Sequence, residues 1–145
     1  MIDLEYQDMH FGDWIANDGG AATRVMTISG SQYVILRWDL DKFKGKKVDG
    51  PGLLELTTYS LQRSPDYQKD FGMIRVVEIS GGNPRWDESS VTCVALCEGS
   101  PLKRVLNSQM FIDVDVNPDR GGKNFITISN PVLQRMVDGK TLGIA

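Results

Sequence analysis

An eight-residue stretch, Tyr33–Leu40, constrains the fold most, because it is the longest uninterrupted β-type run in the chain. Alternate residues form two distinct faces, and this period of two is typical of a strand with one face in a core. The apolar face consists of Val34, Leu36, Trp38 and Leu40. The other face is mixed and carries Tyr33, Ile35, Arg37 and Asp39. We expect the apolar face to be buried and the mixed face to hold functional side chains.

Short segments with β-forming residues continue along the chain. Strands are predicted at Ala22–Ser29, Leu53–Leu61, Gly72–Ser80, Trp86–Thr92, Met110–Val116, Phe125–Ser129 and Thr141–Ala145. The turn at Ser29–Gln32 predicts a hairpin between Ala22–Ser29 and Tyr33–Leu40. One short helix is predicted near the C-terminus. Asn130 suits its N-cap, Pro131 its first turn and Gly139 the position after its end.

This succession of short strands, with turn residues at roughly every tenth position, is typical of all-β folds. Two strands show which side faces inward. The expected inward residues are Leu54, Leu56 and Thr58 in one strand, and Ile112, Val114 and Val116 in the other. The sequence therefore predicts an all-β fold, an antiparallel β-sandwich (jelly roll) with one short helix near the C-terminus. Residues 1–145 are expected to form a single domain, since this length suits one hydrophobic core.

The bulk properties of the chain exclude some classes of partner. The net charge is −3, whereas proteins that bind nucleic acid usually carry a clustered basic excess. No apolar run approaches the roughly 20 residues that a membrane-spanning helix needs. The first residues, Met1–Tyr6, are acidic and mixed, so no signal peptide is expected. We therefore expect neither a nucleic-acid nor a membrane partner.

Cysteines and acidic residues give little support for a metal site. Cys93 and Cys97 are four positions apart, which in a strand is about 13 Å and too far for a disulfide. We expect two free or buried thiols, although a tight loop would still allow them to bond. The run Asp113–Asp119 begins like a calcium loop but has Pro118 where the sharp turn needs glycine. No cofactor is expected, and a structural Ca²⁺ held loosely by Asp3, Glu5 or Asp8 is left open.

Catalytic groups are equally sparse. His10 is the only histidine, and no second titratable partner is placed beside it by the sequence. Trp86-Asp87-Glu88 places an aromatic ring beside two acids, but adjacent acids on a strand point in opposite directions and cannot flank one glycosidic bond. We therefore expect no enzyme activity.

The remaining candidates are aromatic and cationic side chains on outward strand faces. These are Tyr33, Arg37, Tyr59 and Arg75. Tyrosine can stack on a sugar ring, and arginine can donate charge-assisted hydrogen bonds to carboxylates or sulfates. Ordinary cross-strand pairing on a solvated face is the alternative explanation for each residue. We take these four residues as the predicted ligand-binding site.

Several segments, in order, resemble the motifs of the DNRLRE-type domain. They are Leu36-Arg37-Trp38-Asp39-Leu40, Gly52–Leu56, Trp86–Thr92, Asp113–Val116 and the closing segments Val132-Leu133-Gln134, Asp138-Gly139 and Leu142–Ala145. The resemblance implies a jelly-roll sandwich of the carbohydrate-binding-module kind, appended to secreted polysaccharide-degrading enzymes or surface proteins. It also implies that Trp38 and Trp86 occupy aromatic core positions. The last strand of that family has no counterpart after Ala145.

Together these observations predict a non-catalytic carbohydrate-binding module that targets an appended catalytic domain to a polysaccharide. The arginines favour an acidic polysaccharide such as alginate as the ligand. The negative net charge of the chain argues against acidic glycans, so a neutral glycan remains an alternative ligand. The expected location is extracellular, as part of a larger protein. The alternative is a structural or adhesive domain without glycan specificity. A lyase would need His10 beside a tyrosine and an arginine in a cleft.

Overall fold

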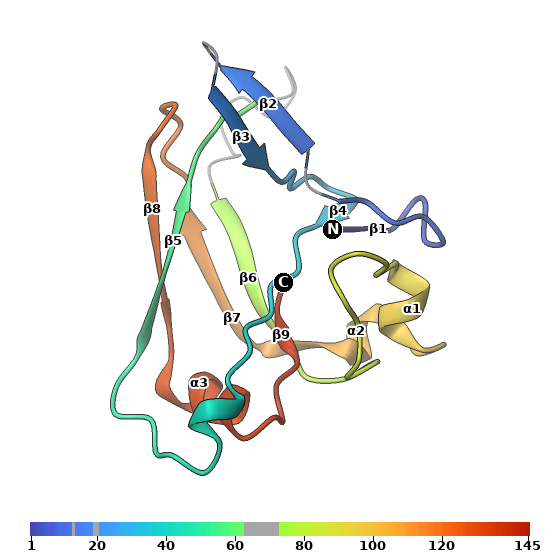
Figure 1. The fold of residues 1–145 in the computed structure, drawn as a ribbon, viewed down its shortest axis with the longest axis vertical. Helices are drawn as coiled ribbons and strands as arrows, with labels where there is room; N and C mark the ends of the chain where they lie inside the picture. Colours follow the sequence, from blue (N-terminus) through green and yellow to red (C-terminus); the bar gives the residue numbers. More distant parts are fainter. Residues whose placement is uncertain (13, 19–20, 63–72) are drawn as a thin grey trace.

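The computed structural model describes residues 1–12, 14–18, 21–62 and 73–145, and it mixes short strands with short helices (Figure 1). The helical segments are η1 (Asp41–Phe43), α1 (Cys93–Cys97), α2 (Leu102–Val105) and α3 (Asn130–Val137). The strands are β1 (Ile2–Asp3), β2 (Trp14–Asp18), β3 (Ala21–Val25), β4 (Gln32–Tyr33), β5 (Gly52–Thr57), β6 (Met73–Ile79), β7 (Leu106–Asp115), β8 (Lys123–Ile128) and β9 (Gly143–Ile144).

The prediction of an all-β jelly roll is wrong. The described strands form separate small sheets, with the orders β1-β4, β2-β3, β5-β8 and β7-β6-β9, and no closed sandwich. Every pairing among the described strands is antiparallel. Most of these pairings join strands that are distant in the sequence, and the helical segments η1, α1 and α2 are absent from the prediction. Alternating patterns identify strands well, yet they do not say which strands will pair.

The strands predicted at Leu53–Leu61, Gly72–Ser80, Met110–Val116 and Phe125–Ser129 are confirmed as β5, β6, β7 and β8, and they enclose one of two apolar clusters. Buried and exposed positions alternate along β5 and β8, as a strand with one face in a core requires. Leu54 and Leu56 of β5 face Ile126 of β8 and Val76 of β6 in this cluster, which we call the sheet core. Figure 1 shows the β5–β8 pair lying against β6 and β7.

The second apolar cluster lies under α1 and α2, and we call it the helix core. It contains Ile2 of β1, Ile79 of β6, Trp86 and Leu96. The predicted strand Trp86–Thr92 is wrong, because residues 84–92 form a loop that leads into α1. The side chain of Thr92 accepts a hydrogen bond from the Ala95 backbone N–H at 3.0 Å and so caps α1.

The two cysteines are free, as expected, but they lie on a helix rather than a strand. Cys93 and Cys97 are one helical turn apart on α1, and both are buried in the helix core. Burial, together with the neighbouring Cys97 thiol, raises the pKa of Cys93 to about 11. A thiol with so high a pKa is a poor nucleophile at neutral pH.

The segment Tyr33–Leu40 is not a continuous strand, which corrects the central prediction. Only Tyr33 belongs to a strand, β4, and Leu36 forms a single antiparallel bridge to Ile144. Its faces also differ from expectation, because Ile35 of the mixed face is buried in the helix core while Leu36 packs against the sheet core. Consecutive side chains therefore enter different apolar clusters.

Three further predictions concern the hairpin, the C-terminal helix and the last strand. The hairpin between Ala22–Ser29 and Tyr33–Leu40 is wrong, because β3 pairs with β2 instead. The C-terminal helix is confirmed as α3, but it begins one residue earlier than predicted, with Ser129 rather than Asn130 as its N-cap and Pro131 in its second position. Gly139 follows the helix with a φ of 71°, a conformation that favours glycine. The predicted final strand is confirmed in part as β9.

A buried carboxylate joins α3 to the sheet. Glu78 of β6 is only 2% exposed, and Arg135 of α3 donates two hydrogen bonds to it, each at 2.7 Å. Asn107 of β7 donates a third at 2.9 Å, and the Thr141 hydroxyl donates a fourth. Four donors from β7, α3 and the segment before β9 thus converge on one residue. These hydrogen bonds compensate for the loss of hydration when the Glu78 charge is buried.

We predict that Glu78→Gln lowers the free energy of unfolding by about 3 kcal/mol, because it leaves Arg135 half-buried without its counter-charge. Urea denaturation followed by circular dichroism measures the loss. The matched control is Asp113→Asn, which breaks the exposed Arg75–Asp113 pair, whose side chains are 61% and 31% exposed. That variant should lose much less stability, because exposed ion pairs are screened by solvent and contribute little. Equal losses in the two variants would contradict the special role of Glu78.

The same carboxylate should make stability depend on pH. Burial alone would raise the pKa of Glu78, but the hydrogen bonds from Arg135, Thr141 and Asn107 outweigh it and hold the pKa below its ordinary value of 4.5. A lowered pKa means that the stabilisation is present above pH 4.5 and is lost as the pH falls through the folded-state pKa. Between about pH 5 and 3, the wild-type chain should lose more stability than Glu78→Gln does. If the unfolding free energies of the two proteins changed in parallel with pH, Glu78 would not be the source of the pH dependence.

Candidate binding groove

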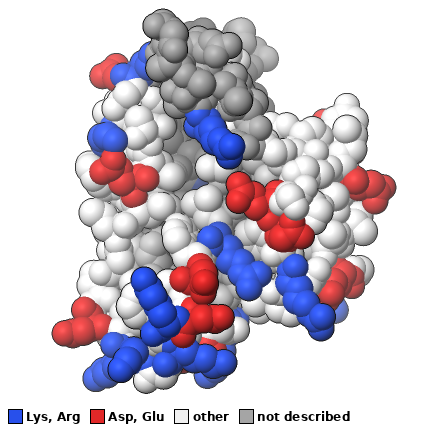
Figure 2. Space-filling view, viewed as in Figure 1, with Lys and Arg blue, Asp and Glu red and all other residues white. Residues whose placement is uncertain are grey.

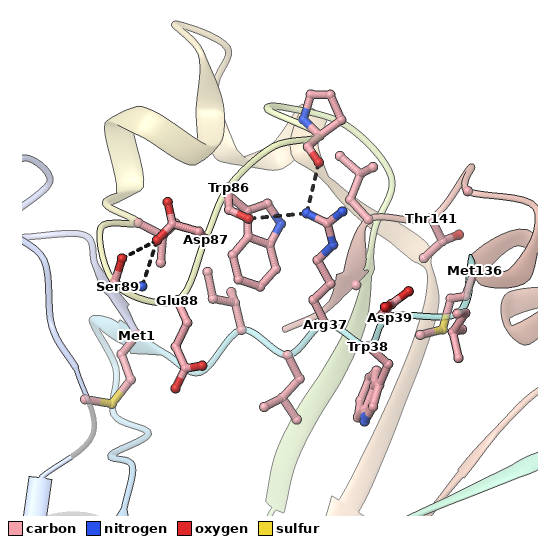
Figure 3. Close-up of a pocket in the computed structure, with 18 of the residues that line it drawn as sticks. Met1, Arg37, Trp38, Asp39, Trp86, Asp87, Glu88, Ser89, Met136 and Thr141 are labelled. Atoms are coloured by element: carbon pink, nitrogen blue, oxygen red, sulfur yellow. Dashed lines mark hydrogen bonds between the residues drawn. The ribbon is translucent and has the colours of Figure 1, made fainter. Parts of the chain in front are cut away.

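An open groove of about 1110 Å³ follows the segment 35–41, and we call it the 35–41 groove (Figure 3). One wall is the loop 84–89, and another is the end of α3 with the segment 139–143. The segment 35–41 is fixed to the fold by the Leu36–Ile144 bridge, in which the two backbone N–H groups donate at 2.8 and 3.0 Å. The groove therefore lies where the two apolar clusters meet.

Glycine is required in the wall beside this bridge. Gly143 has a φ of 145°, which L side chains rarely adopt. A Cβ at Gly143 would collide with the carbonyl oxygen of Leu36 and lie 3.6 Å from the Trp86 ring. The absence of a side chain lets β9 approach both the segment 35–41 and the indole of Trp86.

Arg37 ties the segment 35–41 to the loop wall. Its Nη1 donates to the carbonyl oxygens of Pro84 at 3.0 Å and Trp86 at 3.2 Å. Its guanidinium carbon lies 5.9 Å from the centre of the Trp86 ring, within cation–π range. Figure 3 shows the guanidinium beside the indole, between the two carbonyls. Arg37 is thus held in one orientation by the backbone.

The two tryptophans of the groove differ in burial. Trp86 is 8% exposed and belongs to the helix core, in keeping with the resemblance. Trp38 is 43% exposed, so the expectation that it fills a core position is wrong. The segment turns the Trp38 indole outward, where it lines the groove instead of filling the sheet core. An aromatic ring with half its surface in a groove is available for stacking.

Charges of both signs surround these rings. The described residues of the groove wall carry four carboxylates and three cationic side chains, namely Asp39, Asp41, Asp87 and Glu88, and Arg24, Arg37 and Lys44. Figure 2 shows acidic and basic side chains close together across this view, with basic ones densest at the lower end near η1 and α3. No single sign dominates the groove, so charge alone does not select its ligand.

Asp87 and Glu88 lie together in the groove wall because the segment that carries them is a loop, not the predicted strand. The hydroxyls of Ser89 and Ser90 donate to Asp87, and with the Ser89 backbone N–H they lower the pKa of its carboxyl. Asp87 is therefore committed to its own loop and stays ionised at neutral pH. Sequence reasoning had set both acids aside, although the Trp86-Asp87-Glu88 run was the available signal.

The structure places only one of the four predicted ligand-binding residues, Arg37, in the groove. Tyr33 lies in β4 and packs against the helix core. Tyr59 stacks under the guanidinium of Arg120, which lies 4.4 Å from its ring centre. Arg75 donates to both oxygens of Asp113, at 2.7 and 2.8 Å. The described structure therefore gathers none of the other three beside Arg37, and two of them have ordinary intramolecular partners.

The groove does not assemble the side chains that a lyase would need. His10 lies in its wall, where Nδ1–H donates to the Val91 carbonyl oxygen at 2.8 Å. No tyrosine is found among the described residues of the wall.

Within the described ranges, no three His, Cys, Asp or Glu side chains are grouped as metal ligands. The candidate calcium ligand Asp3 accepts from the backbone N–H groups of Glu5 at 2.8 Å and Tyr6 at 3.4 Å, which explains its burial. Within the same ranges no helix has the length and apolar character to cross a bilayer.

Comparison with known proteins adds no assignment, because no family model matches the chain and neither a curated protein nor a solved structure is detectably similar to it. The resemblance to the DNRLRE-type domain thus stays a prediction. Functional inference depends on the geometry of the groove.

We predict that Gly143→Ala damages the groove wall, since its Cβ would force β9 away from Leu36. The cost should be about 2 kcal/mol, the usual range for overpacking a tight contact. Thermal unfolding measures it, and Gly30→Ala is the control, because nothing lies within 4 Å of the added Cβ there. An unchanged melting temperature for Gly143→Ala would show that β9 can shift freely.

Proposed function

We propose that the 35–41 groove binds a carbohydrate chain without catalysing its cleavage. The observation that carries this proposal is the indole of Trp38, which is 43% exposed in a groove wall rich in polar groups. The apolar face of a sugar ring can stack on an indole, while its hydroxyls need donors and acceptors at the ring edge. A stacking surface beside polar groups provides both kinds of contact.

Polar groups are present on each side of this ring. Figure 3 shows the side chains of Trp38 and Glu88 extending in the same direction from their segments. Glu88 and Asp39 can accept hydrogen bonds from sugar hydroxyls, and charge-assisted bonds of this kind are stronger than neutral ones. The groove is open along its length, which suits the interior of a glycan chain as well as its end.

This proposal keeps the function predicted from the sequence but moves the site. In place of the predicted site on Tyr33, Arg37, Tyr59 and Arg75, we propose a groove that keeps Arg37 in its wall and has Trp38 as its stacking surface. As proposed from the sequence, the domain would direct an appended catalytic domain to a polysaccharide outside the cell. The support for that wider role is the glycan-binding chemistry of the groove, together with the family resemblance.

A structural or adhesive role is the second candidate, and one observation favours it. Leu53 of β5 and Phe125 of β8 are 68% and 54% exposed on the outward face of the β5–β8 pair. Exposed apolar side chains on a flat strand pair are typical of surfaces that contact other proteins. This role predicts no affinity for any glycan.

We predict that Trp38→Ala weakens glycan binding at least tenfold, or about 1.4 kcal/mol, because it removes the stacking surface. Affinity electrophoresis through gels containing alginate, polygalacturonate, chondroitin sulfate, xylan or β-glucan measures the binding. Phe125→Ala is the matched control, since it truncates an exposed aromatic ring outside the groove. Retention of full binding by Trp38→Ala would move the site elsewhere, and uniform mobility of the wild-type chain in every gel would favour the structural role.

A further inference from the structure

Arg37 is the best-defined donor of the groove wall. Two carbonyl oxygens occupy its Nη1, but its Nε and Nη2 have no partner among the described residues. None of the carboxylates described in the structure forms an ion pair with it. The Nε–Nη2 edge of a guanidinium matches the two oxygens of a carboxylate or sulfate. Arg37 therefore offers a fixed, charged fork that the chain itself does not neutralise.

Trp86 provides a second and independent indication. Its indole Nε1–H is buried, and no acceptor for it exists among the described side chains and backbone groups. A buried donor without an acceptor loses its hydration and gains no hydrogen bond in return, which destabilises the unliganded protein. Because this N–H lies in the groove wall beside the guanidinium, its dipole adds to the positive potential there. Two donors without an acceptor thus mark one place in the groove wall.

We propose that this place, the Arg37–Trp86 donor pair, binds the anionic group of an acidic sugar unit. Arg37 makes the direct contact through Nε and Nη2, and the Trp86 indole N–H strengthens the local field. The inference rests on the proposed carbohydrate-binding function and narrows its ligand to glycans that carry carboxylate or sulfate groups. Asp39 and Glu88 repel anions elsewhere in the groove, so the position of the charged group along the glycan becomes part of the specificity.

The geometry also implies a minimum length for the ligand. Arg37 and Trp38 are neighbours, and Figure 3 shows their side chains leaving the segment in opposite directions. One sugar ring cannot stack on Trp38 and reach the Arg37 guanidinium together. A chain of several units that crosses the segment can do both. Oligosaccharides should therefore bind more tightly than the acidic monosaccharide.

The test compares each acidic glycan with its carboxyl-reduced or desulfated form, which has the same backbone without the charge. Alginate, polygalacturonate and chondroitin sulfate are the probes, and binding to the 145-residue chain is measured by affinity electrophoresis at two salt concentrations. We expect the acidic form to bind at least tenfold more tightly, with an affinity that falls as salt rises. Equal binding of the two forms would overturn the donor-pair site while leaving the carbohydrate-binding function intact. Binding to no glycan of any charge would overturn both.

Substitution then assigns the contact to Arg37. Arg37→Gln should lower the ratio of acidic-form affinity to neutral-form affinity at least tenfold, because only the acidic form uses the guanidinium fork. Arg37→Lys, which keeps the charge but not the fork, should give a ratio between those of the wild type and Arg37→Gln. Arg104→Gln, an exposed arginine of α2 outside the groove, is the control and should bind normally. Normal binding by a folded Arg37→Gln variant would overturn the assignment, and the comparison of charged and neutral ligands on the wild type stands even if that variant fails to fold.

A spectroscopic measurement reports on Trp86 itself. The chain has three tryptophans, so its ¹H–¹⁵N spectrum should contain three indole signals. Trp86→Phe identifies the relevant one by its disappearance. We expect this signal to shift on addition of the acidic oligosaccharide and not of its neutral form. A ligand-bound spectrum in which only the Trp38 signal moves would place the anionic group away from the donor pair.

Discussion

The buried carboxylate of Glu78 is the interaction on which the arrangement of this protein depends. It gathers donors from β7, from α3 and from the segment that precedes β9, so the position of each is set relative to β6. These are the parts that carry one side of the 35–41 groove. Apolar packing alone would allow α3 to slide along the sheet core, because apolar contacts have little directionality. The charged hydrogen bonds to Glu78 fix the rotation of α3 and its distance from the sheet. They therefore also fix the position of the groove wall that α3 forms.

Part of this fold could be predicted from the sequence, and the successes share a cause. Alternation in β5 and β8, and the helix signals Pro131 and Gly139, depend on interactions within a few residues. The prediction for Tyr33–Leu40 was wrong because a strand also needs a neighbour to satisfy its backbone groups, and only Tyr33 and Leu36 obtain one. The alternation of apolar and polar residues in Tyr33–Leu40 therefore predicted neither the strand pairing of this segment nor the face that it buries.

The candidate site was predictable to a smaller degree. Arg37 was identified because its residue type is suited to anionic ligands, but Trp38 was assigned to the core because it falls on the apolar face of the alternating segment and at an aromatic core position of the resemblance. Exposure depends on which elements arrive from elsewhere in the chain, and no local pattern encodes that. Glu78 shows the opposite case, since an acid between the apolar residues Val76, Val77 and Ile79 was a visible sign of a buried charge in need of partners.

The placement of Ile35 and Leu36 has a consequence for how the molecule unfolds. These neighbours are anchored in different apolar clusters, so one peptide unit links the helix core to the sheet core. Neither cluster can loosen without pulling on the backbone that the other one holds. We expect two cores coupled in this way to unfold together, even though the described strands form small separate sheets. The groove is built on this shared segment. Its rigidity is therefore limited by whichever of the two cores is less stable.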